Sequence, residues 1–138
     1  MIKACIFDLD GTLTDTIDSL AYSVGETLKE MGLKPITKAQ CQSFVGNGAK
    51  YLLDKSLQAA GDTDAGRLNE AMEIYGRIFD ENCTYHVTAY RGIERMIEKL
   101  KEKEVKLAVL SNKPHRQTVK VAQEIFGGDV FDALQGQQ

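Results

Sequence analysis

The feature that most restricts the fold is an apolar run near the N-terminus that ends in two carboxylates. Apart from Lys3, residues 2–7 are apolar on both alternating faces. Such a run is typical of a strand that is buried on both sides, as in a parallel sheet covered by helices. Asp8 and Asp10 follow it, and Gly11 then supplies a permissive backbone. Because ligands bind at the carboxyl ends of strands in open parallel sheets, we expect the two acids to lie at a functional site.

The segment after Asp15 shows helical patterns and no strand pattern. Apolar residues recur at helical spacing from residue 17 to residue 31, and Thr37 with Gln40 forms a capping box at the start of a second helix. A glycine-rich break at residues 46–48 precedes a third helix, and a fourth covers residues 68–79. Four helices in succession do not fit a simple alternating sheet, so the sequence predicts an all-helical insertion over residues 16–84.

Strand and helix patterns alternate again after the insertion. A helix is predicted over residues 93–100, a buried strand over 105–110, a helix that ends before Gly127, and the start of a third strand over 130–134. The predicted fold is therefore α/β, with a Rossmann-like parallel sheet. We expect the core to comprise residues 1–15 and 85–138, with residues 16–84 as a cap.

Composition limits the partners and the compartment. The 138 residues carry a net charge of −3, which gives no general attraction to nucleic acid or to an anionic membrane. No apolar stretch approaches the roughly 20 residues of a membrane span. The three cysteines are widely spaced, which favours free thiols in a reducing compartment, and we expect a cytoplasmic location.

The residues at the two strand ends suit phosphate chemistry. Asp8 is placed to act as a nucleophile and Asp10 as a general acid and base, and both offer the hard oxygen ligands that Mg²⁺ prefers. Gly11 and Thr12 offer backbone N–H groups, and Thr12 adds a hydroxyl. Across the predicted crevice, Ser111 offers a hydroxyl and Asn112 an amide. Both stand at the start of a predicted helix, whose N-terminus favours anions.

Two motifs resemble those of the haloacid dehalogenase superfamily. Residues 7–15, FDLDGTLTD, resemble its first motif, and residues 110–113, LSNK, resemble its second. The helical insertion and residues 45–50, VGNGAK, are similar to the phosphoglycolate phosphatase-like subgroup. The resemblance implies a phosphatase that forms an aspartyl-phosphate on Asp8, with Asp10 serving the leaving group and then water. It also implies a cap loop that faces the substrate, so Gly46, Asn47 and Lys50 are candidate substrate contacts.

The resemblance also shows what this sequence lacks. Such proteins continue into further strands that carry a lysine clamping the phosphoryl group and a late pair of acids completing the Mg²⁺ site. Asp129 and Asp132 are expected at the opposite edge of the sheet from Asp8, so they cannot take that place. Lys113 is close enough to contact an anion, although lysine is usually a solvated charge. We expect an incomplete core with an open sheet edge, which predicts self-association or reduced stability.

The sequence therefore predicts a Mg²⁺-dependent phosphatase acting on a small phosphorylated metabolite such as phosphoglycolate. One alternative is a phosphoryl transfer of the β-phosphoglucomutase type, in which a sugar phosphate rather than water accepts the phosphoryl group. Another is a non-catalytic piece or interaction domain, because the clamp and the late acids are absent.

Overall fold

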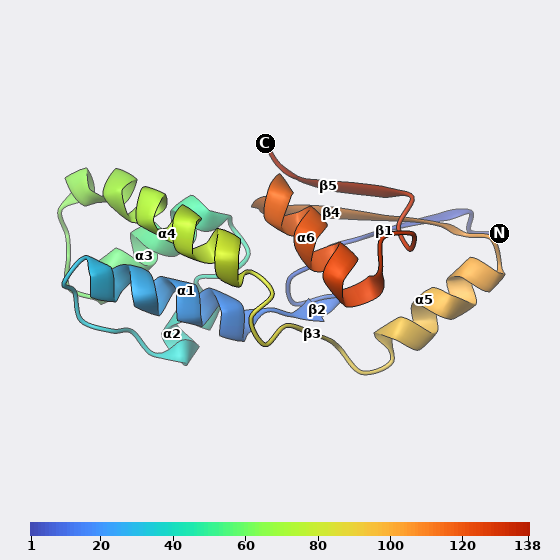
Figure 1. Cartoon of the computed structure of the whole chain (residues 1–138), viewed down its shortest axis with the longest axis horizontal. Coiled ribbons are helices and arrows are strands. Elements are labelled where there is room, and N and C mark those ends of the chain that lie inside the picture. Colours follow the sequence, from blue (N-terminus) through green and yellow to red (C-terminus); the bar gives the residue numbers. More distant parts are fainter. The chain divides into compact units, whose positions relative to one another are not determined.

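The computed structural model describes the backbone of residues 1–138 and every side chain except that of Ala65. The chain divides into two compact units, one formed by residues 1–16 and 87–138 and the other by residues 17–86. Figure 1 shows the strands in the first unit and the bundled helices in the second. Within the part that is described, no helix is both long and apolar enough to cross a membrane.

A three-stranded parallel sheet forms the centre of the first unit. Its strands are β1 (Ala4–Phe7), β4 (Lys106–Pro114) and β5 (Ala133–Gln137), in the order β1-β4-β5 (Figure 1). Phe7 pairs with Val109, and Val109 pairs with Leu134. Helix α5 (Ile93–Glu102) precedes β4, and helix α6 (His115–Phe126) connects β4 to β5. The predicted parallel α/β sheet is confirmed.

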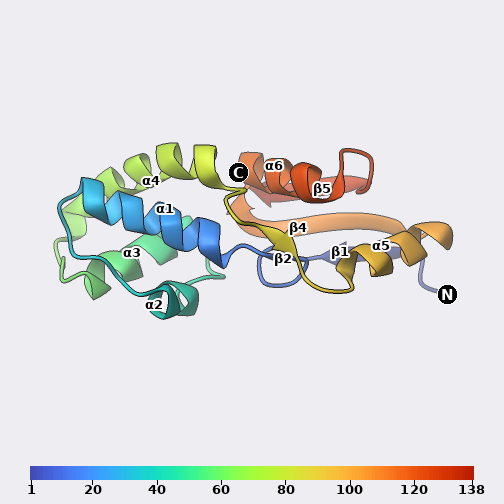
Figure 2. The ribbon, with the colours of Figure 1, turned by 60° about the horizontal axis from the view of Figure 1, so that its bottom comes forward.

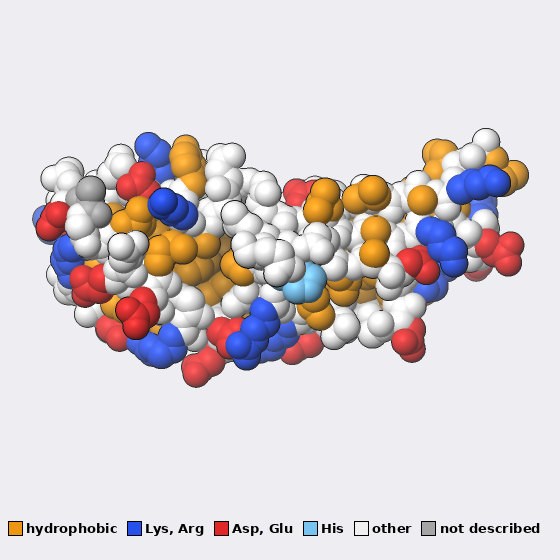
Figure 3. All heavy atoms as spheres, turned by 90° about the horizontal axis from the view of Figure 1, so that it is seen from above, with side chains coloured by type: hydrophobic (Ala, Val, Ile, Leu, Met, Phe, Trp, Pro, Cys, Tyr) orange, Lys and Arg blue, Asp and Glu red, His pale blue; other side chains and the backbone are white. Residues whose placement is uncertain are grey.

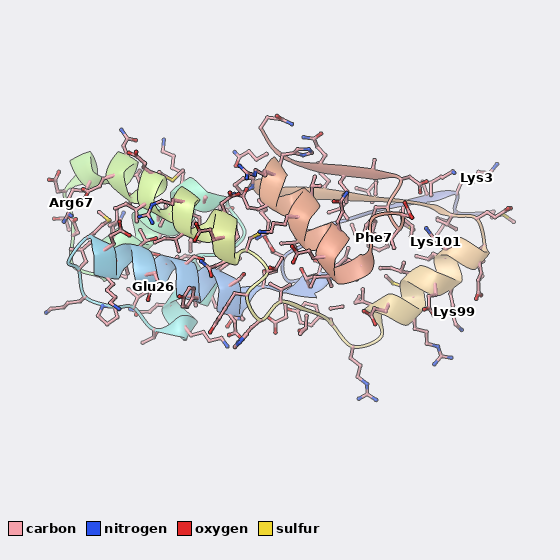
Figure 4. All side chains as sticks on the ribbon, in the orientation of Figure 1. Lys3, Phe7, Glu26, Arg67, Lys99 and Lys101 are labelled. Atoms are coloured by element: carbon pink, nitrogen blue, oxygen red, sulfur yellow. The ribbon has the colours of Figure 1, made fainter. Side chains whose placement is uncertain are left out.

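Apolar side chains from both helices pack on one face of this sheet. The cluster centres on Ile97 of α5 and Leu107 of β4, and Phe126 of α6 packs against it. Cys5 and Phe7 of β1 join the same cluster. Figure 4 shows Phe7 within the first unit, beside α6.

The opposite face of the sheet is exposed, which corrects the prediction of strands buried on both sides. Ile2, Ile6 and Leu110 are 69%, 71% and 57% exposed. The reason is topological: both connections step in the same direction along β1-β4-β5, and right-handed connections then place both helices on one face. Figure 3 shows apolar side chains at the surface of this strand-bearing unit.

Two short strands were not predicted. β2 (Thr14–Asp15) pairs antiparallel with β3 (Thr88–Ala89), so Thr14 faces Ala89 and Asp15 faces Thr88. Each strand has two residues, which is too short for an alternating pattern to be recognised in the sequence. The pair joins the two chain segments that lead into and out of residues 17–86.

The second unit is helical throughout its regular elements. It contains α1 (Ile17–Glu30), α2 (Lys38–Ser43), α3 (Ala49–Ala59), the 3-10 helix η1 (Ala65–Arg67) and α4 (Leu68–Asn82). Helix α1 packs against α4 and α2, as Figure 2 shows. The core of the unit consists of buried apolar side chains from α1, α3 and α4, which include Leu20, Val24, Leu28, Leu53, Tyr75 and Phe79.

Local polar contacts fix the ends of these helices. The predicted capping box is present, since the Thr37 hydroxyl accepts the Gln40 N–H and the Gln40 side chain accepts the Thr37 N–H. Arg67, labelled in Figure 4, donates to the backbone carbonyl of Met31 at 3.1 Å and pairs with Asp62 and Glu70. The two carboxylates raise the pKa of the Arg67 guanidinium, with the Glu70 hydrogen bond as the largest cause and Asp62 as a smaller one. Arg67 thereby ties the start of α4 to the end of α1.

Candidate active site

The polar residues that follow β1 and those in the last part of β4 lie side by side at the carboxyl end of the sheet. Phe7, the last residue of β1, pairs with Val109 in the middle of β4. Asp8 follows Phe7 directly, and Ser111 lies two residues beyond Val109. Residues 111–113 continue β4 as far as Pro114 instead of following the strand as predicted. The parallel register therefore brings the two predicted polar groups to the same edge.

A tight turn holds Asp8 and Asp10 on either side of a buried leucine. The carbonyl of Leu9 accepts N–H groups from three residues, Thr12, Leu13 and Thr14, at 3.2, 3.0 and 3.1 Å. The side chain of Leu9 is fully buried, and Gly11 adopts a φ of 79°, a conformation that side chains disfavour. The turn therefore separates the environments of the acids: Asp8 is exposed, whereas Asp10 is partly buried.

The same hydrogen bonds correct the predicted donors of this turn. The N–H of Gly11 donates to the Thr14 carbonyl at 2.9 Å, and the N–H of Thr12 donates to Leu9. Both groups were expected to face an anion, but here they hold the turn closed. Of the donors expected from Gly11 and Thr12, the exposed Thr12 hydroxyl remains to bind an anion.

Lys113 is buried and paired with Asp10, contrary to the expectation of a solvated lysine. Its Nζ lies 3.2 Å from Oδ1 of Asp10, and the two side chains are 2% and 16% exposed. An ammonium group is rarely buried without a partner of opposite charge, and Asp10 supplies that charge. The sequence could not show this contact, because Asp10 lies in the turn after β1 and Lys113 lies far along the chain on β4.

Ser111 and Asn112 lie beside this pair on β4. Ser111 is buried and its Oγ accepts the N–H of Lys113 at 3.1 Å, which leaves its own hydroxyl hydrogen available as a donor. Asn112 is exposed. A hydroxyl donor, an amide and two carboxylates therefore lie at the carboxyl ends of adjacent parallel strands.

Tyr90 is a neighbour of the site that the sequence did not single out. Its N–H donates to the carbonyl of Leu13 at 3.1 Å, just after β3. Burial raises the pKa of its hydroxyl, and the negative charges of Asp15 and Asp10 raise it further. The position of Tyr90 depends on the unpredicted pairing of β2 with β3.

The remaining predicted residues lie elsewhere. Gly46, Asn47 and Lys50 are in the second unit, near the turn between α2 and α3, so their role stays a prediction. The carboxylate of Asp132 accepts the N–H of Leu107 at 2.8 Å, at the start of β4. Asp132 therefore lies at the amino end of the strands, as expected, and cannot complete a site beside Asp8.

Lys101 of α5 holds the loop before β5 at the amino end of the strands, opposite to the end where Asp8 lies. Nζ of Lys101 donates to the backbone carbonyls of Asp129 and Val130 at 3.1 and 3.0 Å. Figure 4 labels this lysine on α5, together with Lys99 on the same helix. The backbone of Asp129 is therefore anchored to the last turn of α5, which leads into the amino end of β4 and not to the end where Asp8 lies.

The donor set suits Mg²⁺ in part. Among the described residues there is no cluster of three or more His, Cys, Asp or Glu side chains that could hold a metal ion. Mg²⁺, however, is commonly held by one or two protein oxygens, with water and substrate phosphate completing its shell. The exposed carboxylate of Asp8 and the backbone carbonyl of Asp10 fit that pattern.

The fold and the two strand-end motifs are those of a known class of proteins: the chain belongs to the haloacid dehalogenase-like hydrolase family, whose model matches residues 5–138. It is 32% identical over 135 residues to the phosphoglycolate phosphatase of Nitrosospira multiformis, covering 96% of this chain and 60% of the relative. It is 33% identical over 135 residues to that of Aquifex aeolicus, covering 98% and 61%.

A solved structure has the same fold. The crystal structure of a predicted phosphoglycolate phosphatase from Haemophilus somnus superposes with a TM-score of 0.90 at 25% identity. That likeness covers 99% of this chain and 63% of the other. The chain therefore spans about 60% of the length of the curated relatives it matches.

Proposed function

We propose that the protein is a phosphomonoesterase that forms an aspartyl-phosphate on Asp8. The observation that carries this proposal is the placement of Asp8, Asp10 and Ser111 at the carboxyl ends of two adjacent parallel strands. An exposed carboxylate beside a second, partly buried one provides a nucleophile and a separate proton donor. The family and the named relatives support hydrolysis of a phosphate ester as the reaction.

In the first step, a carboxylate oxygen of Asp8 forms a bond to phosphorus while the ester P–O bond breaks. The proton of the Asp10 carboxyl group passes to the departing alcohol oxygen. In the second step, the Asp10 carboxylate takes a proton from water, and the water oxygen bonds to phosphorus. The bond between phosphorus and the Asp8 oxygen then breaks, which regenerates Asp8 and releases inorganic phosphate.

Other residues hold the phosphoryl group during both steps. The hydroxyls of Thr12 and Ser111 and the amide of Asn112 are donors suited to its oxygens, with Gly11 shaping the turn. Bound Mg²⁺, held by Asp8 and Asp10, would neutralise negative charge on the phosphoryl oxygens. The helical unit, residues 17–86, is proposed as a cap in which Gly46, Asn47 and Lys50 contact the substrate.

The substrate class is a small phosphorylated metabolite that resembles phosphoglycolate. This choice rests on the names of the relatives, which favour hydrolysis over a transfer of the β-phosphoglucomutase type. A second candidate is a non-catalytic piece or interaction domain, because Asp132 lies at the amino end of the strands and cannot supply a further acid beside Asp8. The exposed edge strand β1 and the apolar residues beside it support self-association as a further proposal. A cytoplasmic location stays a prediction from the sequence.

The test measures phosphate release from phosphoglycolate and other small phosphate esters by the 138-residue chain, with Mg²⁺ or with a chelator. We expect Mg²⁺-dependent hydrolysis that Asp8→Asn abolishes while its thermal unfolding stays that of the unmodified chain, because Asp8 is exposed. Hydrolysis that survives Asp8→Asn would exclude this nucleophile. A folded chain that releases no phosphate from any ester would favour the non-catalytic reading.

A further inference from the structure

Lys113 is a charged residue that the proposed reaction does not use directly. Its side chain is 2% exposed, whereas lysines are rarely fully buried unless they are paired. Its Nζ lies 3.2 Å from Oδ1 of Asp10, and both of these atoms are shielded from solvent. The pair therefore lies inside the protein, beside the proposed reaction centre, where the attraction between opposite charges is screened less than at the surface.

The backbone around Lys113 is fixed from several sides. The hydroxyl of Thr118 donates to the carbonyl of Lys113 at 3.1 Å and to that of Pro114 at 3.0 Å. The N–H of Lys113 donates to Oγ of Ser111. Gly136 of β5 packs so closely that an added Cβ would lie 2.6 Å from the Lys113 carbonyl oxygen. The ammonium group is thus carried by a segment with little freedom to shift.

We propose that Lys113 is a positioning residue that fixes the Asp10 carboxyl group for proton transfer. This inference rests on the proposed function. Oδ1 of Asp10 is buried against Lys113. The other carboxyl oxygen, Oδ2, is therefore the one that exchanges a proton with the leaving group and with water. Lys113 acts through Asp10 and does not itself contact the phosphoryl group.

The need for this positioning depends on the leaving group. An alkoxide such as that of glycolate is a poor leaving group and requires a proton from Asp10 as the P–O bond breaks. The p-nitrophenolate ion is stable without that proton. A variant that misplaces Asp10 should therefore affect phosphoglycolate much more than p-nitrophenyl phosphate in the first step.

The first experiment compares Lys113→Met with a matched control, Lys103→Met, whose lysine is exposed at the end of α5. Under single-turnover conditions, we expect Lys113→Met to slow phosphorylation by phosphoglycolate about 100-fold, within the usual range for a lost general acid. The rate with p-nitrophenyl phosphate should fall less than about 10-fold, because that step needs no general acid. Equal losses for both esters would overturn the inference, because a structural defect does not depend on the leaving group.

The second experiment tests the pair without turnover, by urea unfolding of Lys113→Met, Asp10→Asn and the double variant. Each single change leaves a buried group without its charged partner, so each should lower the urea midpoint. The double variant should recover most of that loss, because neither charge remains. Additive losses would overturn the inference.

The two experiments separate this inference from the proposed function. If the chain hydrolyses no ester but the double variant recovers the urea midpoint, the proposed function fails for this chain and the Lys113–Asp10 pair stands. If the chain is active but the losses are additive, the proposed function stands and Lys113 has no positioning role.

Discussion

The close packing around Gly136 supports a quantitative prediction. A Cβ at this position would lie 2.5 Å from Cα of His115, 2.6 Å from the carbonyl oxygen of Lys113 and 2.6 Å from Oγ1 of Thr118. Two of these neighbours are backbone atoms, which cannot rotate away. The substitution Gly136→Ala therefore forces β5 away from the segment that joins β4 to α6.

The magnitude follows from the two ways of relieving that clash. Forcing the methyl group into the packed site costs about 1–3 kcal/mol, as for other overpacked cores. Releasing the end of β5 instead breaks the hydrogen bond from the Gly136 N–H to Nδ1 of His115, worth about 0.5–1.5 kcal/mol. It also loses the pairing of Pro114 with Gln137. Either route should lower the free energy of unfolding by about 2 kcal/mol.

Urea unfolding followed by far-UV circular dichroism measures this change. Gly128→Ala is the matched control, since a Cβ there would have no heavy atom within 4 Å, and we expect a change of less than about 0.5 kcal/mol, as for ordinary surface substitutions. Equal stabilities of Gly136→Ala and Gly128→Ala would refute the packing described between β5 and the start of α6.

Two further predictions concern the buried thiol and the open sheet face. Burial raises the pKa of Cys41 from its ordinary value of 9.0 to about 11, so stability should be fully present below pH 9 and fall between pH 9 and 11, by on the order of 2 kcal/mol. Urea unfolding should show that Cys41→Ala lacks this part of the alkaline loss, and an unchanged loss would contradict the assignment. Light scattering should show self-association that increases with concentration, because the exposed sheet face carries apolar side chains. Ile6→Lys should weaken it, whereas the control Tyr51→Lys, in the second unit, should not. A monomer at every concentration would count against an interface on the exposed sheet face.

Much of this arrangement could be predicted from the sequence because it depends on short-range patterns. The helices follow from apolar spacing, and the capping box at Thr37 forms as its residues indicate. The parallel sheet follows from the apolar runs before Asp8 and Ser111. Their shared edge then follows from the parallel direction of the strands.

The unpredicted features depend on contacts between distant residues. An apolar strand pattern does not tell whether a helix covers each face, so the exposure of Ile6 and Leu110 appears only once the strand order is known. The burial of Lys113 depends on Asp10, which lies in the turn after β1, about a hundred residues earlier in the sequence. The turn hydrogen bonds that occupy the Gly11 and Thr12 N–H groups likewise depend on the backbone conformation.

The most direct test of the central claim identifies the residue that carries the phosphoryl group. The chain would be mixed with phosphoglycolate and Mg²⁺, quenched in acid and reduced with borohydride, which converts an aspartyl-phosphate to homoserine. Mass spectrometry of the tryptic peptide that spans residues 4–29 then locates the modified residue. We predict homoserine at Asp8 alone and none after Asp8→Asn; homoserine at Asp10, or turnover with no homoserine at either aspartate, would contradict the account.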